Sequence, residues 1–139
     1  MSTGIKVADE ACQAFEKFKP DSNKTLFMIY KISEDKTTIV VEYTSTETDN
    51  FNTFLERLPE NEGRYALYKM DYTTTDGRPA TKIAFISWSP DAASVKPKML
   101  YAGSKDALLK VLVGISVKVN ATDMSEISEK IVQDACRKF

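Results

Sequence analysis

Residues Lys82–Trp88 read KIAFISW, and they are followed by ASVKPKMLYAGSKDALLKVLV at Ala93–Val113 and by ISVKVN at Ile115–Asn120. The first and third runs are short and rich in apolar and β-branched residues, which predicts two strands. The middle run has the longest helical pattern of the chain, and it tolerates Pro97 only in its first turn. A long helix between two strands is the connection that parallel neighbours need. These segments therefore predict a parallel strand pair covered by a helix.

The other segments predict the rest of a mixed sheet. Apolar residues from Val7 to Phe18 recur at helical spacing, and Pro20 ends that helix. The remaining elements expected before Lys82 are strands at Leu26–Ile32, Thr38–Tyr43 and Arg64–Tyr72, a short helix at Asn50–Leu58 and a loop at Thr73–Pro79. A final helix is expected at Met124–Lys138, opened by Thr122, Asp123 or Ser125. The short connections permit antiparallel pairs, so the prediction is an α/β fold of α+β type.

Composition favours a binding protein over an enzyme. The 139 residues are 42% hydrophobic and 28% charged with a net charge of −1, as in one globular domain and unlike a strong nucleic-acid binder. With no histidine, the chain has no Ser-His-Asp triad, Cys-His pair or histidine-ligated metal. It has no glycine-rich phosphate loop, and Cys12 and Cys136 form no disulfide framework. We expect no cofactor, and the absence of a signal-peptide-like or membrane-spanning run predicts a cytoplasmic protein.

The long predicted helix has two faces at about 100° per residue. The arc expected to face the core holds Leu100, Tyr101, Ser104, Ala107, Leu108, Val111 and Leu112. The opposite arc holds Lys98, Met99, Ala102, Lys105, Asp106, Leu109 and Lys110, with Lys96 at its margin. This second arc is either a solvated face with two incidental apolar residues or a docking surface with apolar anchors and a lysine rim. Five lysines and one acid in residues 96–118 favour an acidic partner.

Several motifs resemble the signature of the actin-depolymerising factor/cofilin family. These motifs are Trp88-Ser89-Pro90-Asp91, Val95-Lys96-Pro97-Lys98-Met99, Tyr101, Ser104-Lys105-Asp106-Ala107-Leu108, Leu58-Pro59-Glu60-Asn61, Arg64-Tyr65-Ala66-Leu67-Tyr68, and Ala121-Thr122-Asp123 before Ser125-Glu126. The resemblance covers essentially the whole chain. It implies a mixed five- to six-stranded sheet sandwiched between helices (the ADF-homology fold), in a single domain at 7–139 after a flexible N-terminal arm at 1–6. It also implies a monomeric protein that binds actin monomers and filaments and promotes filament severing and depolymerisation without catalysis.

The resemblance also implies two sets of site residues. The monomer site falls on Thr3, Gly4, Lys96, Lys98, Met99, Lys105, Asp106, Lys110, Thr122 and Asp123, and the helix pattern adds Leu109. The filament site falls on Arg78, Lys82, Asp134, Arg137 and Lys138. Two family positions that are commonly basic are Ala80 and Ala135 here, so we expect reduced severing.

Further expectations concern regulation and alternatives. The family is often inactivated by phosphorylation just before the glycine of the arm, which corresponds to Thr3, with Ser2 beside it; the alternative is an unmodified arm. Phosphoinositides are expected to compete for Lys96, Lys98, Lys105 and Lys110.

Cytoskeletal localisation is expected, with nuclear entry alongside actin left open. The alternative functions are a module that binds an actin-nucleating complex or decorates filaments without severing, a phosphoinositide adaptor, and, as a different class, a hydrolase with paired carboxylates.

Overall fold

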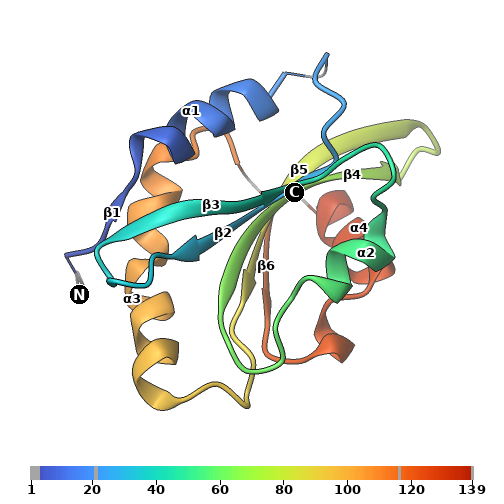
Figure 1. The fold of residues 1–139 in the computed structure, drawn as a ribbon. Helices are drawn as coiled ribbons and strands as arrows, with labels where there is room; N and C mark the ends of the chain where they lie inside the picture. Colours follow the sequence, from blue (N-terminus) through green and yellow to red (C-terminus); the bar gives the residue numbers. More distant parts are fainter. Residues whose placement is uncertain (1–3, 21, 116, 139) are drawn as a thin grey trace.

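The computed structural model describes residues 4–20, 22–115 and 117–138. Within this part of the chain, one sheet of six strands has helices on both faces (Figure 1). The strands are β1 (Lys6–Val7), β2 (Phe27–Ile32), β3 (Thr38–Thr44), β4 (Arg64–Thr73), β5 (Pro79–Trp88) and β6 (Val117–Ala121). The helices are α1 (Asp9–Phe18), α2 (Phe51–Glu56), α3 (Val95–Val111), the short 3-10 helix η1 (Met124–Glu126) and α4 (Glu129–Lys138).

The sheet is mixed, as the sequence predicts, with strand order β1-β3-β2-β4-β5-β6. β2 pairs antiparallel with β3 and β4, and β4 pairs antiparallel with β5. β5 and β6 are parallel, and α3 is the helix that joins them. The parallel pair predicted from the long helical segment is therefore confirmed.

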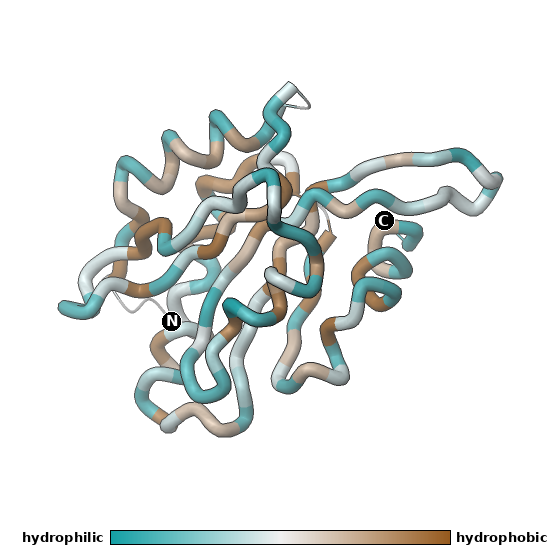
Figure 2. Tube along the Cα trace, turned by 45° about the vertical axis from the view of Figure 1, so that its right-hand side comes forward, coloured by the Kyte–Doolittle hydropathy of each residue, from teal (hydrophilic) through white to brown (hydrophobic). Residues whose placement is uncertain are grey.

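Apolar side chains form one cluster on each face of the sheet. The α1/α3 core lies beneath α1 and α3, and its members include Ile5, Phe15, Met28, Tyr30, Tyr65, Leu67, Phe85, Tyr101 and Leu108. The α2/α4 core lies on the other face, and its members include Phe27, Phe54, Tyr68, Ile86, Trp88, Ile127 and Val132. Figure 2 shows the apolar strands at the centre of the molecule and the β4–β5 hairpin projecting beyond it.

Local sequence explains where the first two helices form. In α1, Ala11, Phe15 and Phe18 repeat at helical spacing and are all buried. α2 begins at a capping box, because the Asn50 side chain accepts from the Thr53 N–H and the Thr53 hydroxyl accepts from the Asn50 N–H. Both helices thus begin and end close to the predicted positions.

The structure corrects three predicted boundaries. The final helix is interrupted, because Ile127 is fully buried between η1 and α4, and Ser128 accepts a hydrogen bond from the Ile131 N–H at the start of α4. The strand that was expected to begin at Lys82 begins at Pro79, because the chain already pairs with β4 at that residue. The chain also joins the sheet before Val7: Ile5 is 6% exposed and Lys6 pairs with Thr38, whereas the sequence placed residues 1–6 in a flexible arm.

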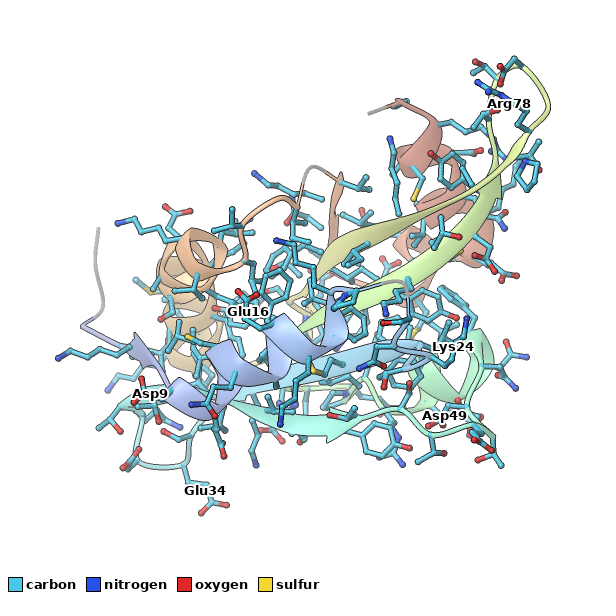
Figure 3. The ribbon with its side chains drawn as sticks, turned by 90° about the horizontal axis from the view of Figure 1, so that it is seen from above. Asp9, Glu16, Lys24, Glu34, Asp49 and Arg78 are labelled. Carbon is cyan, nitrogen blue, oxygen red and sulfur yellow. The ribbon has the colours of Figure 1, made fainter. Side chains whose placement is uncertain are left out.

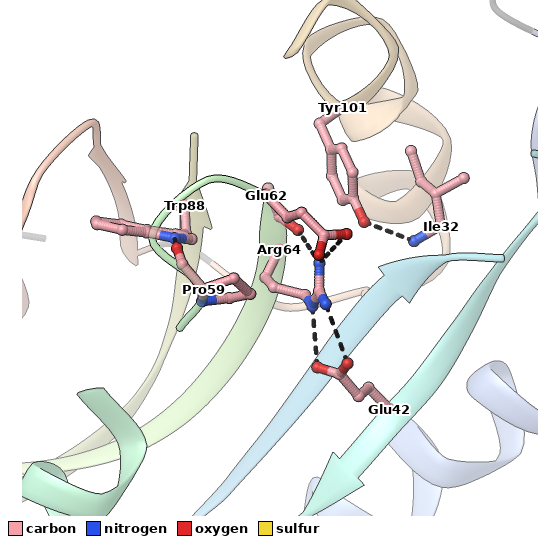
Figure 4. A network of polar contacts seen from close by, with 8 residues as sticks. Ile32, Glu42, Pro59, Glu62, Arg64, Trp88 and Tyr101 are labelled. Carbon is pink, nitrogen blue, oxygen red and sulfur yellow. Dashed lines mark hydrogen bonds and ion pairs between the residues drawn. The ribbon is translucent and has the colours of Figure 1, made fainter. Parts of the chain in front are cut away.

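A β-bulge directs one acid toward a buried cation. Ile29 pairs with Tyr43 and Tyr30 with Val41, so Glu42 is the extra residue of β3. Its carboxylate accepts from Arg64 Nε at 2.9 Å and from Arg64 Nη2 at 3.1 Å, across β2 (Figure 4). The Arg64 side chain is only 8% exposed, so this bidentate pair neutralises the buried guanidinium charge at the first residue of β4.

Tyr30 places a hydroxyl group inside the apolar α1/α3 core. Its side chain is fully buried, and within the described residues its hydroxyl has no hydrogen-bond partner. Burial also raises the pKa of this hydroxyl, with the nearby Cys12 as a smaller cause. An unsatisfied buried hydroxyl costs about 1–3 kcal/mol.

Tyr30→Phe is therefore expected to leave the protein as stable as before or to stabilise it by up to about 1 kcal/mol. Urea unfolding measures this change. Tyr65→Phe is the matched control, because the Tyr65 hydroxyl donates to the Tyr101 carbonyl, and its loss should destabilise. A clear loss of stability in Tyr30→Phe would contradict the expectation.

Candidate functional site

Tyr101 fixes α3 to the sheet. Its hydroxyl accepts from the Ile32 N–H at 3.0 Å (Figure 4), and its carbonyl accepts from the Tyr65 hydroxyl. Its ring passes so close to Gly63 that a Cβ there would lie 2.8 Å from the Tyr101 Cγ. The outward surface of α3 is therefore held in one orientation.

The first turns of α3 expose an apolar strip bordered by lysine. Val95 is 70% exposed and Met99, one turn later, is 67% exposed. Lys96, the residue after Val95, is exposed to one side of them, and Asp106 and Lys110 further along the helix are also exposed. Large exposed apolar residues that lie together mark interaction surfaces, so this geometry favours the docking interpretation of the second arc of the long helix.

Polar contacts join this strip to the end of β6 and the loop after it. Lys98 Nζ donates to the Asp91 carbonyl at 3.3 Å, and the Asp91 N–H donates to the Thr122 carbonyl at 3.0 Å. Lys105 Nζ donates to Asn120 Oδ1 at 3.2 Å. The helix residues and the loop residues of the predicted monomer site thus lie on one continuous surface.

The loop after β6 is shaped by side-chain caps. Asp123 accepts from the Ser125 N–H at 2.8 Å and opens η1. Glu126 accepts from the Thr122 N–H at 2.8 Å, and the Thr122 hydroxyl and N–H hold the pKa of the Glu126 carboxyl below its ordinary value. Thr122 and Asp123 remain exposed, so the loop presents both at the surface.

The N-terminal part of the predicted monomer site is described only from Gly4. Gly4 is exposed, and its φ of +77° is a conformation that favours glycine. It precedes β1, which lies against α3. The predicted site residue Thr3 and the predicted phosphorylation positions Ser2 and Thr3 lie outside the described residues.

Leu109 does not lie where the helix pattern placed it. It is partly buried and packs against the α1/α3 core, so its assignment to the exposed face is wrong. That core contains residues from the chain before α1 and from α1 itself as well as from the sheet, and it covers a wider arc of α3 than the sheet alone would. Leu109 is thus a packing residue at the edge of the site.

Leu109→Glu is therefore expected to destabilise the fold by about 1–3 kcal/mol, because it places a charge against an apolar cluster. Met99→Glu is the matched control and should change stability by less than about 0.5 kcal/mol, since Met99 is 67% exposed. Thermal unfolding of both variants makes the comparison. Equal stability of the two variants would show that Leu109 is exposed after all.

The sequence reasoning missed the apolar residues that flank the predicted site. Val95 and Met124, at 70% and 44% exposed, lie on α3 and in the loop after β6. Val95 precedes Met99 by four residues, which is a signal that helical periodicity could have supplied. Met124 had no such signal, because it begins η1 and only the tertiary fold brings it beside the loop after β5.

The predicted filament-site residues lie elsewhere, on the β4–β5 hairpin and α4. Arg78 is at the hairpin tip (Figure 3), exposed and paired with Asp76 at 2.9 Å. Lys82 Nζ donates to the Cys136 carbonyl at 3.1 Å. Arg137 Nε donates to the Thr73 carbonyl at 2.7 Å, and its Nη1 contacts Asp134 at 2.5 Å. Lys138 is exposed.

Ala80 and Ala135 are both half-buried in this region. Ala80 pairs with Tyr72 in the hairpin, and Ala135 packs at the edge of the α2/α4 core. The five predicted filament-site residues therefore lie on the hairpin and α4. Lys82 and Arg137 hydrogen-bond between these two elements, and Asp134 pairs with Arg137 within α4.

The chain is similar in sequence and in fold to known actin-binding proteins. Residues 4–137 match the family model described as cofilin/tropomyosin-type actin-binding protein. The cofilin of Mycosarcoma maydis is 46% identical over 96% of this chain and 95% of its own. The cofilin of Schizosaccharomyces pombe is 43% identical over 98% of each chain. The crystal structure of Streptomyces griseoflavus cofilin superposes with a TM-score of 0.87 at 36% identity, covering 97% of this chain and 98% of that one.

These similarities extend over the whole domain. The chain belongs to the cofilin/actin-depolymerising factor family, and it is an actin-binding, actin-depolymerising protein associated with the actin cytoskeleton. In the described part of the chain, no helix combines the length and the apolar character that a membrane crossing requires.

Proposed function

We propose that this protein binds actin monomers through the exposed face of α3 and the adjoining loop after β6. The observation that supports the proposal best is the strip of Val95 and Met99 beside Lys96, fixed in orientation by Tyr101. Apolar anchors with a charged rim are the usual anatomy of an interface, and the lysines favour an acidic border on the partner.

The proposed mode of action is differential binding. A protein that binds one filament conformation more tightly than another shifts the population toward it and weakens contacts between subunits. This account requires no catalysed reaction and no cofactor from the chain. We propose that the protein acts in the cytoplasm; its proposed monomeric state and its lack of nucleic-acid binding remain predictions.

We further propose that filament severing is weaker than in relatives with basic residues at positions 80 and 135. Lys82 and Arg137 are already hydrogen-bonded to backbone carbonyls, so they are less available to a neighbouring subunit. Arg78 is exposed, and solvent screens its exposed pair with Asp76, so Arg78 is the basic residue of the hairpin most available to a partner.

Ala80→Arg combined with Ala135→Arg is expected to raise the severing rate, because two guanidinium groups would restore a basic cluster beside the hairpin. Imaging of filament lengths over time measures severing. Ala80→Arg alone is the control for folding, since Ala135 packs at the edge of an apolar core. If the unmodified protein already severs as fast as relatives with both basic residues, then Arg78, Arg137 or Lys138 supplies the contact and the proposal fails.

Two further proposals concern regulation. Phosphoinositide headgroups would compete with actin for Lys96, Lys98, Lys105 and Lys110, of which Lys96 and Lys110 are exposed. Phosphorylation at Ser2 or Thr3 would add about −1.5 to −2 charges near an acidic partner. Vesicles containing phosphoinositides should reduce actin binding, whereas neutral vesicles should not.

Actin co-sedimentation with imaging of filament length tests the proposed function as a whole. It separates monomer binding, filament decoration and severing. We expect monomer binding and decoration with slow severing. Decoration with no severing would indicate the alternative of a module that decorates filaments without severing them. An absence of binding to either form of actin would contradict the proposal.

A further inference from the structure

A shallow groove of about 280 Å³ opens where the loop after β5 meets the loop after β6. Its apolar wall consists of Trp88, Pro90, Ala92 and Met124. Its rim includes the acidic residues Glu60, Asp91 and Asp123. The groove adjoins the α3 surface, because Lys98 Nζ contacts the Asp91 carbonyl.

The groove is formed before any partner binds. Trp88 is 3% exposed, and its indole N–H donates to the Pro59 carbonyl at 2.7 Å (Figure 4). Two hydrogen bonds join the two loops. The Ser89 N–H donates to the Ala121 carbonyl at 2.9 Å, and the Asp91 N–H donates to the Thr122 carbonyl. A preformed groove loses little conformational entropy when it is filled.

The rim of the groove is acidic, whereas the neighbouring face of α3 carries the exposed lysines Lys96 and Lys110. Asp123 is engaged by Ser125, but in the described ranges no cation forms an ion pair with the Glu60 or Asp91 carboxylate, and both residues are exposed. An apolar wall beneath uncompensated carboxylates complements an apolar side chain that is flanked by a cation.

We propose that this groove receives an apolar side chain of the actin monomer that has a basic residue beside it. The inference rests on the proposed function and adds a second, oppositely charged contact to it. The α3 lysines favour an acidic region of the partner and the groove favours a basic one. Two contacts of opposite sign fix how the partner is oriented.

Filling the groove tests its occupancy. Ala92→Phe is expected to weaken actin-monomer binding at least about tenfold, because the new ring occupies the space of the incoming side chain. Ala92→Ser is the matched control at the same exposed position and should bind like the unmodified protein. Wild-type affinity in a folded Ala92→Phe variant would overturn the proposal.

Reversing a rim charge tests the sign of the occupant. Glu60→Lys is expected to weaken binding about threefold to tenfold at low salt, with a smaller effect at high salt. Glu16→Lys makes the same charge change on α1 (Figure 3) and should have little effect. Tighter binding in Glu60→Lys would mean that the occupant is acidic, which would overturn the proposal.

The two proposals fail in different ways. If Ala92→Phe and Glu60→Lys bind normally while the double variant Lys96→Ala, Lys98→Ala binds weakly, the groove is unoccupied and the α3 site stands. If the lysine double variant also binds normally, the proposed function of the α3 surface fails, and this inference fails with it.

Discussion

Replacing Lys96 and Lys98 together by alanine is expected to weaken actin-monomer binding about tenfold to a hundredfold, or about 1.4–2.8 kcal/mol. Beside the exposed apolar strip of Val95 and Met99, Lys96 is exposed and Lys98 is half-buried. The loss of two charges should also make the binding less dependent on salt. Fluorescence titration of labelled actin monomers at two salt concentrations measures both effects.

The fold should survive this change. Lys98 gives up one exposed hydrogen bond to the Asp91 carbonyl, so the melting temperature should fall by only a few degrees. Lys17→Ala with Lys24→Ala removes the same charge from exposed positions near α1 and should leave affinity unchanged. Unchanged affinity for actin monomers in the folded Lys96→Ala, Lys98→Ala variant would contradict the assignment of the monomer site to α3.

Glu42→Ala is expected to destabilise the protein by about 2–4 kcal/mol, because it leaves the Arg64 guanidinium buried without its carboxylate. The expected cost lies below that of a fully buried pair, since the Glu42 side chain is 29% exposed and Glu62 lies 3.7 Å from Arg64 Nη1. Urea unfolding measures the loss.

Two variants separate this effect from a general surface effect. Asp76→Ala breaks the exposed pair with Arg78 and should leave the free energy of unfolding nearly unchanged, because solvent screens the pair. Adding Arg64→Met to Glu42→Ala removes the uncompensated charge and should recover part of the stability. Equal losses in Glu42→Ala and Asp76→Ala would contradict this account of the buried pair.

Much of the fold followed from local patterns. The long helical run between two apolar segments predicted the parallel β5–β6 pair, and the antiparallel strands followed from short connections. β1 could not be predicted, because two residues show no periodicity and pair only once β3 exists. The break before α4 depends on Ile127 being buried, which is a tertiary effect. The bulge at Glu42 likewise follows from pairing with β2.

The candidate site was predicted in part. Helical periodicity and family resemblance together found Lys96 and Met99, which lie where they were expected. Periodicity misplaced Leu109, because the angle around a helix does not reveal how many neighbours cover it. The groove between Ala92 and Met124 had no local signal, since its walls come from two loops that only the β5–β6 pairing brings together.

Hydrogen–deuterium exchange of the complex with actin monomers tests the central claim most directly. We expect slower exchange in the first half of α3 and in residues 121–126, and no change at the tip of the β4–β5 hairpin. Amides that a partner covers open less often, so protection maps the interface. Protection of the hairpin and α4, with α3 unchanged, would contradict the assignment of the monomer site to α3.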